Sequence, residues 1–112
     1  QDEAEALVVN CHLDLPICEA HREAVLQVSM ALNHELWLGH FIYDQESDRV
    51  SLRLTLPLRG AGGATPEQIE DVVDIILGES ELAYPVLYQV AVGELAPCEA
   101  AKLSLIAHQG EA

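Results

Sequence analysis

Four side chains near the N-terminus have the chemistry of metal ligands: Cys11, His12, Cys18 and His21. Thiolate sulfur and imidazole nitrogen are ligands that zinc prefers. If the segment from Ile17 is helical, Cys18 and His21 lie three residues apart and share one helix face. A small-ligand or metal-binding sensor built on these four residues is therefore one hypothesis for the function.

The spacing of these residues argues against that hypothesis. The pattern C-x6-C-x2-H matches no common zinc motif. Cys11 and His12 would also point to opposite faces of a strand. We therefore expect neither a metal nor a cofactor, with Cys11 packed as a small apolar residue and His21 solvated.

Another group of residues has the chemistry of a catalytic site. Ser29, His34 and Asp44 are the residue types of a nucleophile, a base and an orienting acid, and His40 lies near them in the sequence. No nucleophile elbow or other catalytic signature surrounds them. The glycine-rich segment 60–63 lacks the Gly-Lys-Ser/Thr ending of a phosphate loop, and acids follow it. The sequence therefore predicts a protein that is not an enzyme.

The charge balance narrows the class of partner. The 112 residues carry 19 acids against 5 Lys and Arg, for a net charge of −14. Phosphate backbones and anionic membranes both require clustered bases, so we expect no nucleic acid and no membrane partner. A basic or amphipathic polypeptide is compatible with this charge. The plain alternative is that the charge only maintains solubility.

The cysteines and the first residues suggest a compartment. Three cysteines cannot all pair within one chain, and the first six residues, QDEAEA, are acidic where a signal peptide is basic. Reduced thiols in a cytoplasm are the expected state. No apolar run approaches the roughly 20 residues of a membrane-spanning helix. The start at Gln1 suggests a trimmed chain.

Period-two patterns predict three strands. Apolar residues occupy every second position of one stretch, as in a half-buried strand: Val50, Leu52, Leu54, Leu56 and Leu58. The polar turn at residues 45–48 joins this stretch to the one before it, which predicts a β-hairpin over residues 37–58. Residues 4–13 alternate in the same way and predict another strand.

Helical spacing predicts two long helices. The first is expected from Ile17 to about Leu36, ending near residues 33–34, with Asp14 or a neighbour as its cap and Pro16 in its first turn. The second begins at Thr65, because Pro66 and Gln68 complete a capping box. Its expected buried stripe comprises Ile69, Val72, Val73, Ile76, Leu77 and Ser80. Its expected outer face comprises Glu67, Glu70, Asp71, Asp74 and Glu81.

Pro85 lies inside the second helical pattern. We expect one helix from Pro66 to Val92 with a kink at Pro85. The alternative makes residues 86–92 a strand, since valine and tyrosine also favour strands. Residues 96–101 are expected to form a final short helix.

The order of strand, helix, hairpin and long helix resembles the YbjN-like family of bacteria, described as sensory transduction regulators. Residues 32–44 (LNHELWLGHFIYD) resemble the family's helix end, its glycine and its F-x-x-D strand. Residues 50–58 resemble its second hairpin strand, and residues 65–67 (TPE) its L-T-P-E helix start. Residues 84–87 (YPVL) and 93–100 (GELAPCEA) resemble its helix-to-proline segment and its terminal G-x-x-P-E-E-A. The resemblance covers residues 5–101.

The family resemblance implies a fold similar to the class I type III secretion chaperones. These are small, acidic α+β homodimers that bind other polypeptides. The implied fold is an antiparallel sheet with a central hairpin packed against two main helices, as one domain over residues 1–112. The chaperones usually carry an extra helix and strands before the segment that matches residues 4–13, so we expect a trimmed chain or a minimal version.

The implied function is that of a non-enzymatic interaction module, a chaperone-like or regulatory adaptor that binds a protein or peptide. An open strand edge invites pairing, so we expect a homodimer with twofold symmetry. The candidate interaction surface comprises Trp37, Tyr84 and Tyr88, because aromatic side chains concentrate binding energy. Ordinary core packing is the alternative for these residues. Arg49 and Arg53 are expected to pair with nearby acids.

Overall fold

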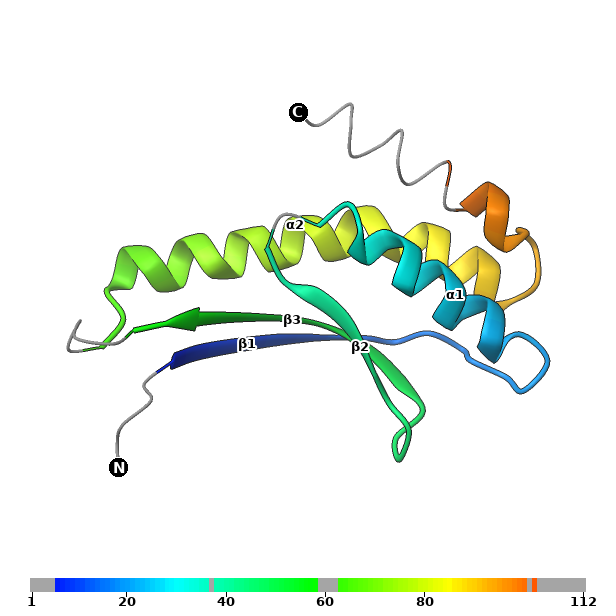
Figure 1. The fold of residues 1–112 in the computed structure, drawn as a ribbon, viewed down its shortest axis with the longest axis horizontal. Coiled ribbons are helices and arrows are strands. Elements are labelled where there is room, and N and C mark those ends of the chain that lie inside the picture. The colour runs from blue at the N-terminus through cyan, green and yellow to red at the C-terminus, as the bar shows by residue number, and fades with distance from the viewer. Residues whose placement is uncertain (1–5, 37, 59–62, 101, 103–112) are drawn as a thin grey trace.

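Three antiparallel strands form one sheet, and both main helices cover the same face of that sheet (Figure 1). The computed structural model describes residues 6–36, 38–58, 63–100 and 102. In chain order the elements are β1 (Ala6–Leu13), α1 (Arg22–Asn33), β2 (His40–Asp44), β3 (Arg49–Pro57) and α2 (Pro66–Ala91). The predicted α+β class and the predicted order of elements are confirmed.

β3 is the central strand of the sheet, with β1 on one side and β2 on the other. Leu13 pairs with Val50 at one end of the β1–β3 ladder, and Asp44 pairs with Arg49 beside the hairpin turn. Residues 45–48 form that turn, as predicted. Asp48 closes it with a φ of 55°, a left-handed conformation that aspartate tolerates better than most residues.

The core is aliphatic, in keeping with an aromatic content of 4%. Its largest fully buried side chains come from β3 and from both helices: Val25, Val28, Leu32, Val50, Leu52, Leu54, Leu87 and Val90. The predicted leucine face of β3 is therefore confirmed. Phe41 adds an aromatic side chain from β2, opposite Leu52.

The predicted start of the first helix is wrong. α1 begins at Arg22, and the residue that caps it is His21, whose side chain makes no capping hydrogen bond. Upstream, the Leu15 N–H donates to the Leu13 carbonyl, and the Ile17 N–H donates to the Leu15 carbonyl. These two three-residue turns keep the chain out of a helix while Leu15 and Ile17 pack against the core.

α2 is one continuous helix through Pro85, so the alternative strand at residues 86–92 is wrong. The predicted capping box is present. The Gln68 N–H donates to the Thr65 hydroxyl, and the Thr65 N–H donates to the Gln68 side chain. The helix ends one residue before the predicted Val92, and residues 97–100 form the predicted short terminal helix.

The buried stripe of α2 is narrower than predicted. Val72, Ile76 and Ser80 are buried, whereas Ile69, Val73 and Leu77 are between 36% and 48% exposed. Neighbouring positions point about 100° apart around a helix, and a helix that lies on a sheet buries one arc of its surface. All five acids of the expected outer face are exposed.

Two glycines fix the junctions of the fold. Gly39, before β2, has a φ of 81°, and a Cβ added there would lie 2.9 Å from the Arg53 carbonyl oxygen. Asn33 secures the same junction, because its side chain donates to the Phe41 carbonyl and accepts from the Phe41 N–H. After α2, Gly93 takes a φ of 80° and allows the Glu94 N–H to reach the Gln89 carbonyl.

Candidate functional site

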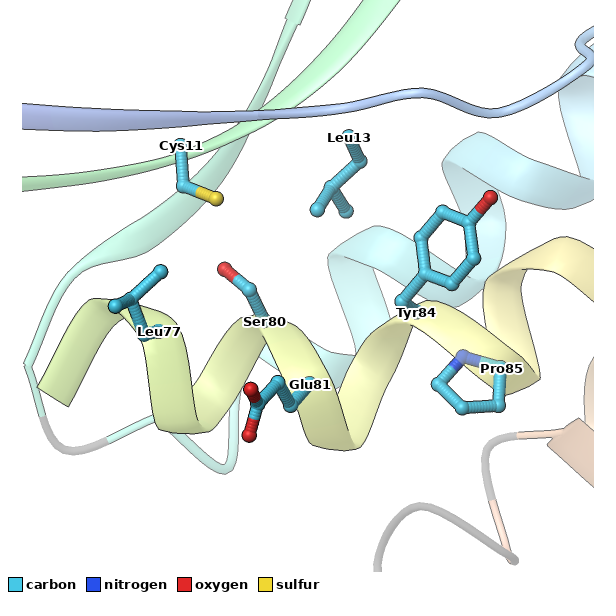
Figure 2. Close-up of a pocket in the computed structure, with 7 residues that line it drawn as sticks. All are labelled: Cys11, Leu13, Leu77, Ser80, Glu81, Tyr84 and Pro85. Carbon is cyan, nitrogen blue, oxygen red and sulfur yellow. The ribbon is translucent and has the colours of Figure 1, made fainter. Parts of the chain in front are cut away.

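An apolar groove lies between β1 and α2 (Figure 2). It has a volume of about 340 Å³, and its walls present almost entirely carbon and sulfur. Two residues of β1 and five of α2 line it: Cys11, Leu13, Leu77, Ser80, Glu81, Tyr84 and Pro85. We refer to these seven residues as the β1–α2 groove.

The periodicities of the two elements produce this groove. Cys11 and Leu13 are alternate residues of β1, so both point from the sheet toward α2. Leu77, Ser80 and Tyr84 follow at intervals of three and four residues, which places them on one helix face. β1 is an edge strand, and its outer edge meets no other strand among the described residues. The groove is therefore bordered by unpaired strand backbone.

Ser80 is a polar residue in this apolar setting. Its side chain points from α2 toward β1 (Figure 2), and the residue is 6% exposed. The hydroxyl oxygen is buried and has no hydrogen-bond partner in the described part of the chain. An unsatisfied buried hydroxyl costs roughly 1–3 kcal/mol. The groove therefore holds an unused hydrogen-bonding group.

Two of the three residues of the predicted interaction surface lie at one end of the groove. Tyr84 lines it, and its hydroxyl donates to the Asp14 carbonyl at 2.9 Å. The ring of Tyr88 lies 6.0 Å from the ring of Tyr84 between centroids and is tilted by 40°. Tyr88 remains 42% exposed. Trp37, the third predicted residue, lies outside the described residues.

Pro85 alters the backbone beside the groove. A proline has no N–H, so the carbonyl of Glu81 lacks its usual helical donor four residues on. In Figure 2 the side chains of Glu81 and Pro85 lie on the side of α2 that faces away from β1. The Glu81 carboxylate is thus at the outer margin of the groove.

A comparison with protein families identifies the chain. The family model YbjN, described as "Putative bacterial sensory transduction regulator", matches residues 1–89. The chain belongs to this family. The YbjN match spans all three strands, α1 and every residue that lines the groove. No curated protein and no solved structure matched the chain.

The metal hypothesis finds no support in this YbjN structure. Cys11 faces the groove, whereas the His12 ring nitrogen Nδ1 lies 2.6 Å from the Ser51 hydroxyl. Cys18 precedes α1 and is exposed, so it does not share a helix face with His21. Among the described residues, no three His, Cys, Asp or Glu side chains are grouped to hold a metal ion.

The residues considered for catalysis have separate structural environments. Ser29 is buried and donates to the Val25 carbonyl of its own helix. Asp44 accepts from the Glu46 N–H and the Ser47 hydroxyl within the hairpin turn. His34 caps the end of α1 and His40 begins β2, and both are exposed. No hydrogen bond joins these described side chains into a catalytic unit.

Sequence reasoning missed a hydrogen-bonded cluster formed by Arg22, Tyr43 and Asp48. Arg22, the first residue of α1, donates to both carboxylate oxygens of Asp48, at 2.9 and 2.8 Å. The Tyr43 hydroxyl donates to the same carboxylate. The hydrogen bonds from Arg22 and then from Tyr43 lower the pKa of Asp48 to about 2. The same contact with Asp48 raises the pKa of Tyr43 above its ordinary value.

The helices of the structure can be compared with those that span membranes. None of the helices in the described ranges combines the length and the hydrophobicity that crossing a bilayer requires.

Proposed function

We propose that this YbjN chain is a non-enzymatic interaction module that binds an extended polypeptide segment in the β1–α2 groove. The observation that carries the proposal is an apolar groove alongside a strand edge with no partner strand among the described residues. A peptide added to such an edge gains backbone hydrogen bonds from the strand and specificity from side-chain pockets. The groove volume of about 340 Å³ suits one or two apolar side chains.

The charge of the surroundings suggests the composition of the bound segment. Glu81 lies in the groove wall, and exposed acids continue along α2 at Glu67, Glu70, Asp71 and Asp74. A segment that carries Lys or Arg beside its apolar anchors would be attracted, and an acidic one repelled. The bound segment is therefore amphipathic and basic.

Two further features support a polypeptide as the occupant. Tyr84 is held by its bond to Asp14, so it offers a contact surface that loses little entropy on binding. Tyr88 extends that surface toward solvent.

The family description agrees with a regulatory or adaptor role. We propose that this role is chaperone-like and is carried out in the cytoplasm. The secretion chaperones that the sequence resembles act in a similar way. Such a protein would bind a segment of its partner and would catalyse no reaction.

A peptide selection tests the proposal. A displayed library of random peptides is selected on the protein, and the affinities of the selected peptides are measured by fluorescence anisotropy. Leu77→Asn removes an apolar side chain from the groove, and Met30→Asn is its control. Leu77 is 48% exposed on α2, whereas Met30 is 65% exposed on α1 and does not line the groove.

We expect the selected peptides to combine basic and apolar residues. Their affinity should fall about tenfold or more in Leu77→Asn, since one anchor in a desolvated pocket contributes at least 1.4 kcal/mol in typical interfaces. Met30→Asn should bind as the wild type does. Equal binding by both variants, or selection of acidic peptides, would remove the basis for the proposal.

A further inference from the structure

Both main helices lie on one side of the sheet (Figure 1), and the opposite face of the sheet is largely polar. Twelve strand residues point to this side, by alternation and register: Ala6, Val8, Asn10, His12, His40, Ile42, Asp44, Arg49, Ser51, Arg53, Thr55 and Pro57. We call this set the open face. All of them except Ser51 and Ile42 are exposed, which agrees with both helices packing on the other side.

On the open face, basic side chains outnumber acidic ones, although the protein as a whole is acidic. The chain has 5 Lys and Arg against 19 acids, yet two of those five cations, Arg49 and Arg53, lie on this face. Asp44 is the only carboxylate in the three described strands. His12 and His40 add two imidazoles. Cations are therefore concentrated on the open face while the acids of α2 lie on the opposite side of the molecule.

A hollow of about 310 Å³ lies within the open face, between Arg49 and Arg53. The other polar residues of its lining are Asn10, His12, Tyr43, Asp44, Ser47 and Ser51. The two arginines are four residues apart on one strand, so their Cα atoms are about 13 Å apart, with Ser51 between them. Ser51 is 4% exposed, so its hydroxyl, paired with His12, lies at the bottom of the hollow.

The hydrogen bonds in the hollow leave donors in excess. Arg53 uses its Nε to donate to the Asn10 side chain at 2.9 Å, and that bond orients its guanidinium group. The side chain of Arg49 makes no hydrogen bond or ion pair with any described residue, contrary to the expected pairing with acids. Asp44, the cross-strand neighbour of Arg49, also lines the hollow, and its oxygens accept from the Glu46 N–H and the Ser47 hydroxyl. The lining thus has two arginines against one carboxylate.

We propose that this hollow binds a small polyanion that bears phosphate or carboxylate groups. The planar fork of arginine matches the oxygens of either group, and Arg53 is already oriented. The hollow has the size of a small-metabolite site. The site lies on the opposite side of the sheet from the β1–α2 groove, so it is a second site, independent of the peptide proposal.

Titration calorimetry at low ionic strength tests the site with two probes, inorganic pyrophosphate and citrate. Sodium chloride at matched ionic strength shows how much of any signal is general charge screening. Arg49→Gln is the informative variant, because the side chain has no structural bond to lose. Lys102→Gln is its matched control, since it removes the same charge from an exposed position on the C-terminal helical turn.

We expect at least one probe to bind the wild-type protein, with affinity reduced about tenfold in Arg49→Gln and unchanged in Lys102→Gln. Binding of pyrophosphate alone would identify a phosphate ligand, and binding of citrate alone a carboxylate ligand. Absence of binding by both probes at millimolar concentration would overturn the proposal. Equal loss in the two variants would do so as well, because it would indicate general charge attraction.

Discussion

Asp48 joins three elements through one carboxylate. Arg22 at the start of α1 and Tyr43 of β2 both donate to it, and its own left-handed φ of 55° closes the turn before β3. The side chains of Arg22 and Asp48 are 35% and 33% exposed, so solvent screens their attraction. The contribution of this group to stability therefore depends on hydrogen-bond geometry more than on net charge.

Acid should weaken the fold through Asp48. Its pKa is lowered from 3.8 to about 2 in the folded protein, so the stabilisation is complete above pH 3.8 and is lost as the pH falls toward 2. Urea denaturation across that range should show this loss in the wild type. Asp48→Asn keeps a residue that tolerates the left-handed turn but has no such titration. An equally steep acid dependence in the variant would contradict this assignment.

Ser80 should lower the stability of the free protein. Ser80→Ala removes a buried hydroxyl without a partner, so we expect the free energy of unfolding to rise by about 1 kcal/mol in urea denaturation. Ser29→Ala is the matched control, since both changes gain the same helix propensity and Ser29 already donates to the Val25 carbonyl. An equal gain in the two variants would mean that the Ser80 hydroxyl carries no penalty.

At the scale of elements, two glycines of the α2 region differ in their tolerance of a side chain. Gly78 lies within the helix, and an added Cβ would meet open space. Gly93 follows the helix at a φ of 80°, and an added Cβ would lie 2.6 Å from the His21 ring. The end of α2 is thus packed against the start of α1, and the middle of α2 is free to accept a side chain.

Alanine substitutions at these glycines should have opposite effects. Gly78→Ala should stabilise the protein by about 0.8–1 kcal/mol, because alanine is the better helix former. Gly93→Ala should destabilise it by at least about 1–2 kcal/mol, because of the left-handed backbone, and the contact with His21 adds to that. Thermal denaturation followed by circular dichroism measures both. A stabilising Gly93→Ala would show that the helix end relaxes without cost.

At the scale of the whole molecule, the exposed apolar residues of α2 extend beyond the groove. Ile69 and Val73 lie one helical turn apart and are 44% and 36% exposed. Neither lines the β1–α2 groove. We propose that this part of α2 contacts a second copy, which leaves the groove and the open face accessible in a twofold dimer.

Light scattering after size-exclusion chromatography should give twice the 12.2 kDa of one chain. Val73→Asp should shift the protein toward the monomer, because a charge would be buried in the interface. Met30→Asp is the control, since Met30 is 65% exposed on α1 and lies away from Val73 in the sequence. A monomer at every concentration would contradict the dimer. Dissociation by Met30→Asp alone would place the interface on α1.

The sequence alone determined the local features of this protein. Alternation in residues 4–13 and 50–58 predicted the strands observed at 6–13 and 49–57, and residues 45–48 predicted the turn between β2 and β3. The capping box at Thr65 predicted the start of α2. These features depend on residues a few positions apart, so short-range chemistry is sufficient to specify them. The order of such features also led to the YbjN family.

The tertiary structure decided what depends on distant residues. Ile76 is buried and Leu77 is exposed because of the way α2 lies on the sheet. The spacing of apolar residues in the sequence does not distinguish these two positions. The groove combines residues 11–13 with residues 77–85, and only packing brings them together. The same holds for Arg22 with Asp48. Strand alternation predicted that Arg49 and Arg53 share a face, but only the placement of both helices on the other face left those arginines open to a ligand.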